Sequence, residues 1–406
     1  MLKYLNPKYY IKLLWQYKWE LLLSVCMFSN LYSFVLPNYL YYVLWLVFIL
    51  AIAKLHARSS GLRASLTFGL IGLIMFSTVI NFSMMDYRWI MMCIILYITL
   101  CRTSYRFFHF KERFLFVSLF GYIFTGLINN YAHAIGFNFM LIYGVHAGEE
   151  FTFDFSGFTN NPMWLSAACG LGIIFLSYWM NLLWGQGKRL LALLMLPLMF
   201  LTLQTLVWGG SRSALGISIG ASLLLVWLSN KNVGKTILVF SAFVALAYIA
   251  TPVLMSDSHK MQSKQGGMNF VDESGETSRT ALWNARVEEF RSSPIWGIGF
   301  GVTGIGDEAK SGRAETGSGW LTVLSQTGII GLILALLIVK RAMLPLRLLR
   351  KNHRMALYSA LLVFLCLHTM FEAYLFQSGW YLCFVFWLIV SVLDDYKKFY
   401  KMELAR

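Results

Sequence analysis

Residues 319–339 read GWLTVLSQTGIIGLILALLIV, an apolar run that contains no charged residue and ends at Lys340. A helix that crosses a bilayer needs about 20 apolar residues, so this run predicts a membrane-spanning helix. The run is typical of the chain, which is 58% hydrophobic and only 13% charged. Because soluble domains carry about 25% charged residues, this composition argues against a soluble fold.

Apolar runs bounded by charge recur along the chain, and they predict an all-α polytopic membrane protein with about 12 transmembrane helices. The predicted spans are residues 20–37, 38–53, 64–81, 89–101, 114–130, 162–182, 190–209, 214–229, 236–254, 319–339, 355–375 and 379–393.

The spans divide the chain into three parts. Residues 1–254 are expected to form transmembrane helices 1 to 9, with a loop on the outer side of the membrane at 131–161. Residues 255–318 are expected to form a large outer loop that contains an amphipathic helix, and residues 319–406 the last three transmembrane helices and a cytoplasmic tail.

The net charge of +15 comes from 34 Lys and Arg against 19 Asp and Glu. If both termini are cytoplasmic, most basic residues fall in inner segments and most acidic residues in outer ones. This distribution follows the positive-inside rule. Membrane topology therefore explains the excess positive charge, and we expect a lipid bilayer and no nucleic acid as partner.

The long outer loop contains one readable helix, TSRTALWNARVEEFRSSP at 277–294. Thr277 or Ser278 would cap this helix, and Pro294 would end it. Its spacing places two guanidinium groups on the same face as an apolar stripe, which suits a helix at the level of the lipid headgroups. The residues on this face are Arg279, Leu282, Trp283, Arg286 and Phe290.

Two features follow this helix. The stretch IWGIGFGVTGIG at 295–306 is glycine-rich and can bring its backbone close to a ligand or to another helix. Ser318 is the expected cap of the span that begins at residue 319. The positive end of that helix dipole would then face Glu315 and any bound anion.

Arg212 directly follows a predicted span and is flanked by small residues, Gly210, Ser211 and Ser213, which leave its guanidinium accessible. A charged side chain at the membrane edge often marks a functional site. An arginine that extends to the interface without any function is an equally good interpretation of Arg212 alone.

Arg212, Arg279, Arg286 and Glu315 are expected on the same face of the membrane. Each arginine of the long loop could be a solvated charge, but the set together suggests a site for a diphosphate-bearing lipid. One guanidinium group can donate two parallel hydrogen bonds to phosphate oxygens. A carboxylate can take a proton from an incoming hydroxyl. This combination is typical of glycosyl transfer.

His368 and Glu372 are spaced i, i+4 in the predicted span 355–375, so they are expected to share a helix face. The favoured interpretation is a structural pair in which the two side chains hydrogen-bond to each other.

At this point the sequence resembles the O-antigen ligase and O-antigen polymerase superfamily of bacterial envelope glycan assembly. GFTNNPMWLSAACGL at 157–171 resembles the family's Gly-x-x-x-Asn-Pro segment, and GGSRSALGISI at 209–219 its Ser-Arg-small motif. The most specific patch is SRTALWNARVEEFRSSPIWGIGFG at 278–301, followed by WLTVLSQTGIIG at 320–331. The resemblance also covers the plan of about twelve spans with a large outer loop before the last three.

The resemblance implies a GT-C-type glycosyltransferase of the inner membrane that takes a glycan from undecaprenyl diphosphate at the periplasmic face. It implies no metal and no cofactor. Arg212 and Arg279 match the arginines that hold the lipid diphosphate as leaving group, and Glu315 completes the expected catalytic set. The residues expected to contact substrate are Arg286, Ser211, Ser213, Asn161, Ser318, Trp283, His368 and Glu372.

Family ligases have a His-Asn pair just before the tenth span, where this chain has Glu315-Thr316-Gly317-Ser318. This difference favours a polymerase of lipid-linked repeat units. A ligase that transfers the glycan to lipid A-core or another acceptor, and a transporter of lipid-linked sugars, are the alternatives. Expected partners are the glycan donor, a glycan or lipid acceptor, and chain-length regulator and flippase proteins.

Overall fold

The chain is mostly helical in a computed structural model that describes residues 14–59, 61–81, 86–143, 155–229, 278–305, 310–311 and 317–404. The elements before residue 230 are α2 (Lys18–Phe28), α3 (Leu40–Lys54), α4 (Gly61–Ile80), α5 (Arg88–Leu96), the π-helical turn η3 (Tyr97–Cys101), α6 (Tyr105–Ala134), α7 (Phe139–Tyr143), α8 (Pro162–Gly185), α9 (Arg189–Leu193), α10 (Met195–Trp208) and α11 (Arg212–Ser229). The later elements are α14 (Ser278–Ser292), β1 (Val302–Thr303), β2 (Lys310–Ser311), α15 (Gly319–Ala342), α16 (Leu346–Leu349), α17 (His353–His368) and α18 (Tyr381–Leu404). Strands β1 and β2 pair antiparallel.

Of the described helices, six are long and apolar enough to cross a membrane: α4, α6, α8, α9 together with α10, α11 and α15. Three shorter apolar helices, α3, α5 with η3, and α17, coincide with further predicted spans. These helices confirm the predicted all-α, multi-pass membrane protein. The predicted span 236–254 lies outside the described residues, and the number of twelve spans stays a prediction.

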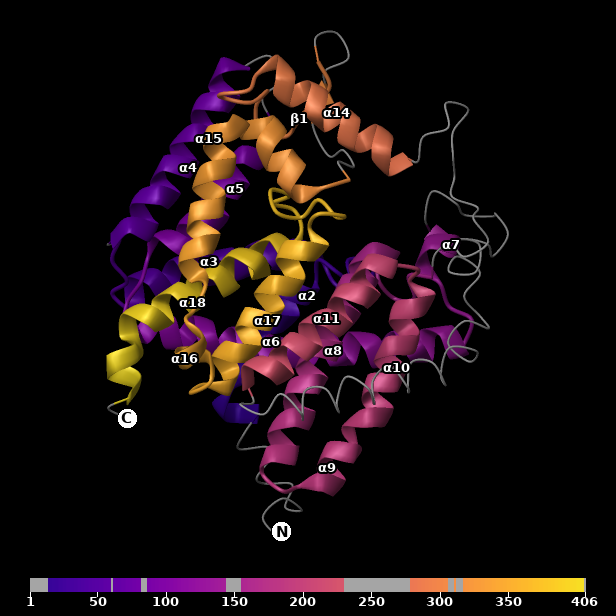
Figure 1. Ribbon diagram of the computed structural model, residues 1–406. Helices are drawn as coiled ribbons and strands as arrows, with labels where there is room; N and C mark the ends of the chain where they lie inside the picture. Colours follow the sequence, from indigo (N-terminus) through magenta and orange to yellow (C-terminus); the bar gives the residue numbers. More distant parts are fainter. Residues whose placement is uncertain are drawn as a thin grey trace.

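Helix α8 lies inside the helix bundle, where it packs against α6, α10, α11 and α17 (Figure 1). The Asn161 side chain caps α8 by accepting a hydrogen bond of 2.8 Å from the Met163 N–H. Pro162 is the first helical residue, a position that needs no backbone N–H. The Asn-Pro pair therefore opens a helix as the sequence predicts.

The predicted spans 20–37 and 355–375 are too long. Helix α2 ends at Phe28 and α17 ends at His368, and irregular chain follows each of them. The Asn30 side chain joins the two irregular segments by donating a hydrogen bond of 2.9 Å to the Gly379 carbonyl. Non-helical backbone at membrane depth is stable only when it is buried in protein or lines a cavity, so these segments mark a place where a cavity can form.

The glycine-rich stretch after α14 packs against a break in α15. Gly328 interrupts the helix with φ +63° and ψ −169°, a conformation that only glycine adopts readily. A Cβ at Gly297 would lie 2.3 Å from the carbonyl carbon of Gln326. The Ile298 N–H donates a hydrogen bond of 2.9 Å to the Ser325 carbonyl at the break. Of the two roles expected for these glycines, close approach to another helix is confirmed.

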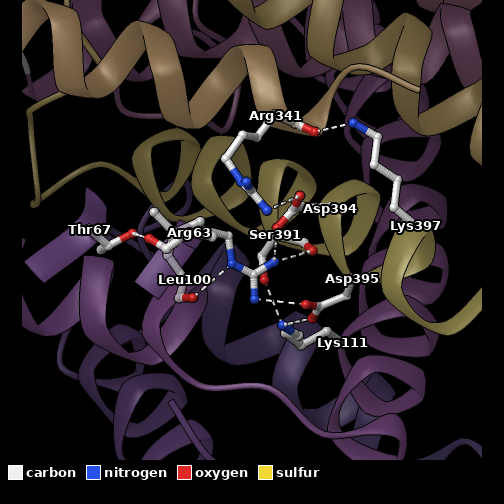
Figure 2. Close-up of polar contacts among 9 residues, drawn as sticks. All are labelled: Arg63, Thr67, Leu100, Lys111, Arg341, Ser391, Asp394, Asp395 and Lys397. Atoms are coloured by element: carbon white, nitrogen blue, oxygen red, sulfur yellow. Dashed lines mark hydrogen bonds and ion pairs between the residues drawn. The ribbon is translucent and has the colours of Figure 1, made fainter. Parts of the chain in front are cut away.

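A buried ionic cluster of Arg63, Lys111, Arg341, Asp394 and Asp395 ties the far end of α15 to α4, α6 and α18 (Figure 2). Arg63 lies 3.3 Å from Asp394 and 2.7 Å from Asp395. Lys111 lies 2.6 Å from Asp395, and Arg341 lies 3.5 Å from Asp394. Because α14 packs on the other half of α15 (Figure 1), this ionic cluster and α14 mark opposite ends of the bundle.

Candidate functional site

Arg279 lies in the first turn of α14 and contacts the connection between α17 and α18. Its Nη2 is 3.3 Å from Glu372 Oε1, and the Arg279 side chain is 39% exposed whereas that of Glu372 is 8% exposed. The guanidinium carbon lies 5.8 Å from the centre of the Phe371 ring. The start of α15 contacts the same connection, since the Gly319 N–H donates a hydrogen bond of 2.7 Å to the Thr369 carbonyl.

Helix α14 is held against the start of α15 by Trp283. The indole N–H donates a hydrogen bond of 3.1 Å to the Gly317 carbonyl. Ser318 caps α15 as predicted, because its hydroxyl accepts from the Leu321 N–H at 3.5 Å. Arg279, Trp283, Ser318 and Glu372 therefore belong to one group, called the Arg279 cluster below. Glu315, the predicted base, lies outside the described residues.

The predicted pairing of His368 with Glu372 on one helix face is wrong, because α17 ends at His368. The His368 ring instead stacks on Phe364 and Tyr374, with ring centres 5.2 Å and 5.8 Å away. Within the described part of the chain, neither of its ring nitrogens has a hydrogen-bond partner. The arginine of α14 takes the place of the expected histidine beside Glu372.

Arg286 is buried whereas Arg279 is partly exposed. Both lie on the face of α14 that was predicted to combine guanidinium groups with an apolar stripe. The Arg286 side chain is 5% exposed, and its Nη2 lies 2.5 Å from Glu289 Oε1. That carboxylate also accepts a hydrogen bond of 2.6 Å from the Gly304 N–H. Burial lowers the pKa of Arg286 and raises the pKa of Glu289, since it disfavours the charged form of each. This pair fixes the glycine-rich stretch against α14.

Arg212 is the first residue of α11 and is exposed to solvent. The Ser211 hydroxyl caps α11 by accepting from the Ala214 N–H at 3.3 Å, and it lies 3.2 Å from the Ser213 hydroxyl. Among the residues that the structure describes, Arg212 has no ion-pair partner, and no contact joins it to Arg279. The two serines therefore shape the turn that presents the Arg212 guanidinium.

The α10–α11 turn sits directly on the start of α8. A Cβ at Gly209 would lie 2.5 Å from the Ser166 hydroxyl and 3.3 Å from the Pro162 carbonyl. On the other side of this start, the Trp164 ring contacts the Trp380 ring at 4.5 Å. The start of α8 therefore lies between the Arg212 turn and the α17–α18 connection.

A cavity of about 440 Å³ opens where these segments meet, and Asn161 is the predicted site residue that lines it. The rest of the wall comes from the irregular chain after α2 and α17, the starts of α3, α5, α7 and α8, the glycine-rich stretch and α15. Its lining is Asn30, Ser33, Asn38, Tyr42, Tyr87, Arg88, Met91, Phe139, Asn160, Asn161, Trp164, Phe300, Gly301, Thr303, Thr322, Gln326, Phe376, Gln377, Ser378, Gly379 and Trp380.

Sequence reasoning missed this cavity. The available signal was the presence of amide side chains such as Asn30 and Gln326 inside apolar runs, where a polar group needs a partner. Within the described ranges, no group of three or more His, Cys, Asp or Glu side chains is placed to hold a metal ion.

Residues 197–336 match the family model described as O-Antigen ligase. The resemblance to the O-antigen ligase and polymerase superfamily is thereby confirmed. The matched region runs from α10 into α15 and includes Arg212, Arg279 and Ser318. No curated protein matches the chain. The family match indicates an O-antigen ligase-like function and a glycosyltransferase-like enzyme, which agrees with the multi-pass helical fold.

Proposed function

We propose that this protein is a membrane glycosyltransferase that polymerises undecaprenyl-diphosphate-linked oligosaccharide repeat units at the periplasmic face of the inner membrane. In this proposal Arg279 and Arg212 bind the lipid diphosphate. Glu315 is the general base, and no metal takes part.

The exposed guanidinium of Arg279 is the observation that carries this proposal. Among the described residues, one carboxylate, Glu372, orients the side chain through one nitrogen, and more than a third of the side chain is accessible. A guanidinium has five N–H donors in a planar fork, and in this proposal the donors that do not contact Glu372 bind phosphate oxygens. The nearby start of α15, capped by Ser318, adds the positive end of a helix dipole.

The proposed reaction is a single displacement. The hydroxyl oxygen of the acceptor sugar forms a bond to the anomeric carbon of the donor while the bond from that carbon to the phosphate oxygen breaks. Undecaprenyl diphosphate leaves with the electron pair, and the acceptor proton passes to Glu315. Arg279 and Arg212 would stabilise the charge that grows on the leaving diphosphate, which is the usual largest contribution to such catalysis.

A ligase is the second candidate, and the description of the matching family favours it. The Glu315-Thr316-Gly317-Ser318 segment, where family ligases are expected to have His-Asn, favours the polymerase. The two reactions share the donor and the leaving group and differ in the acceptor.

The glycan of a deletion strain separates these candidates. A polymerase deletion leaves single repeat units attached to the final acceptor, whereas a ligase deletion accumulates long chains on undecaprenyl diphosphate. Complementation with Arg279→Ala should reproduce the deletion phenotype, while Arg291→Ala should restore the glycan. Arg291 is a matched control because it lies on the same helix and pairs with the exposed Glu288. Normal glycan with Arg279→Ala would refute the assigned role of Arg279.

A further inference from the structure

We propose that the 440 Å³ cavity binds an uncharged sugar residue of the glycan, separately from the arginines that would hold the diphosphate. This inference rests on the proposed function and assigns the part of the substrate that the Arg279 cluster does not explain. The volume of the cavity is within the range of about 300 to 1,000 Å³ that is common for small-molecule sites.

The chemistry of the wall favours a neutral ligand. Six amide side chains and several hydroxyls supply both donors and acceptors, and none of the described residues that line the cavity has a carboxylate. Arg88 is the one cation among the described lining residues, and Asp86 neutralises it with a carboxylate oxygen 3.4 Å from the Arg88 Nε. These described residues offer no unpaired cation to a diphosphate, whereas the many hydroxyls of a sugar match their amides well.

Gln326 provides the most direct indication that the cavity accepts a polar ligand. It is 4% exposed, and its side-chain carbonyl oxygen has no hydrogen-bond partner in the described part of the structure. Its amide nitrogen lies 3.5 Å from the Val302 carbonyl, a weak contact. A buried acceptor without a partner costs about 1 to 3 kcal/mol. Because Gln326 lines the cavity, a small rotation of its amide towards a ligand hydroxyl would remove this cost.

Aromatic rings complete the wall. Trp164 and Trp380 contact each other at 4.5 Å with ring planes 58° apart, and both line the cavity. The apolar C–H face of a pyranose ring packs well on such an indole face, while its hydroxyls reach the amides at the rim. Small-molecule sites typically combine an aromatic lining with a few polar groups in this way.

The position of the cavity fits a glycan whose diphosphate lies at the Arg279 cluster. Thr322 and Gln326 follow Ser318 along α15, and Gln377 and Trp380 follow Glu372 along the α17–α18 connection. The same two segments therefore supply both the Arg279 cluster and one wall of the cavity. A sugar in the cavity would lie next to the place where the glycosyl bond is exchanged.

Saturation-transfer NMR on the purified full-length protein in nanodiscs tests the site directly. The probe is the free repeat-unit oligosaccharide prepared from the organism's own polysaccharide. Wild type should transfer saturation to the sugar protons, and Gln326→Leu should weaken binding by about fivefold, as expected for one lost hydrogen bond. Trp380→Leu should also weaken binding. Gln204→Leu is the matched control, because Gln204 lies on α10 outside the cavity.

Arg279→Ala separates this inference from the proposed function. It should leave binding of the free oligosaccharide unchanged while it abolishes glycan synthesis. If the undecaprenyl-diphosphate-linked unit displaces the oligosaccharide, the cavity binds a sugar of the donor. If it does not, the cavity binds a sugar of the acceptor. Either result supports the site. Wild-type affinity in both Gln326→Leu and Trp380→Leu, or no saturation transfer in the wild type, would overturn it, whatever the glycan phenotype of Arg279→Ala.

Discussion

Arg63 and Arg279 lie at opposite ends of the helix bundle and are held in opposite ways. The Arg63 guanidinium donates to the Leu100 and Ser391 carbonyls at 2.9 Å and 3.0 Å and contacts Asp395 at 2.7 Å, with its side chain 5% exposed (Figure 2). Among the residues that the structure describes, Arg279 makes one ion pair at 3.3 Å, and its side chain is 39% exposed. The same residue type therefore completes a closed structural network at one end and is partly exposed at the other.

The ionic cluster shows what a structural charge requires in this protein. Its two aspartates are shared among three basic residues from α4, α6 and α15, so each buried charge has an opposite charge beside it. Burial of an unpaired charge is costly, whereas a paired one is tolerated. Arg279, whose ion pair among the described residues is with Glu372 and whose side chain is 39% exposed, is held less tightly and is better placed to bind an anion.

The largest effect is expected at the ionic cluster. Asp395→Ala should destabilise the protein by about 3 to 5 kcal/mol, because it leaves Lys111 and part of Arg63 buried without a counter-charge. Thermal unfolding in detergent measures this loss. Glu288→Ala is the control, since it removes an exposed pair with Arg291 that is expected to contribute less than about 1 kcal/mol. Equal melting temperatures for the two variants would show that the ionic cluster stabilises the protein no more than an exposed ion pair does.

The next effect concerns activity and not stability. Arg279→Ala should lower the rate of glycosyl transfer by about 100- to 1,000-fold, as is typical when one group that stabilises a developing negative charge is removed. Its melting temperature should fall by less than that of Asp395→Ala, because the Arg279 side chain is 39% exposed although the Glu372 carboxylate that it contacts is buried. Arg279→Lys should recover only part of the rate, since an ammonium lacks the planar fork.

This prediction is measured by the incorporation of labelled repeat units in membrane vesicles, together with thermal unfolding of the same preparations. A strong loss of stability in Arg279→Ala would show that the arginine is structural, as Arg63 is. Full activity in Arg279→Lys would show that a point charge is sufficient and that paired phosphate contacts are not used.

The features that the sequence predicted well depend on neighbours along the chain. Helix α14 follows from Pro294 after its end and from the spacing of its apolar residues, while Thr277, one of its two predicted caps, lies outside the described residues. The starts of α8 and α15 follow in the same way from Asn161-Pro162 and from Ser318. In each case the residues that decide the structure lie within one or two helical turns of it.

The features that the sequence could not predict depend on distant partners. Arg279 and Glu372 are 93 residues apart, and the Asn30 side chain bonds to Gly379, 349 residues away. The early end of α2 could not be predicted either, because hydrophobic residues continue after Phe28. Hydropathy does not distinguish a helix from irregular chain that lines a cavity. The cavity was missed for this reason.

A smaller effect on stability is expected at the break in α15. Gly328→Ala should destabilise the protein by about 1 to 3 kcal/mol, because φ of +63° with ψ of −169° is strained for any residue with a Cβ. That Cβ would also lie 2.2 Å from the Ile295 carbonyl oxygen. Gly216→Ala in α11 is the control, since nothing lies within 4 Å of its Cβ position. Equal melting temperatures would mean that the glycine-rich stretch does not need this break.

The smallest effect is expected at the buried ion pair of Arg286 with Glu289. This pair lies on α14, the same helix as the partly exposed Arg279. Burial raises the pKa of Glu289 above its ordinary value of 4.5. As pH rises from about 4.5 towards the raised pKa, the unfolded chain loses this proton before the folded protein does. The contribution of Glu289 to stability is therefore complete below 4.5 and decreases as pH rises through this window.

Melting temperatures of wild type and Glu289→Gln across this pH range isolate the effect. Gln can still accept the hydrogen bond from the Gly304 N–H but does not titrate, so the stability of wild type relative to the variant should fall with increasing pH. A rising difference would mean that Arg286 outweighs burial and holds the carboxylate charged, as the basic residues do for Asp395 at the other end. The glycine-rich stretch would then be fixed by a pair of the same kind as the ionic cluster, whereas Arg279 at the start of the same helix has a partly exposed side chain.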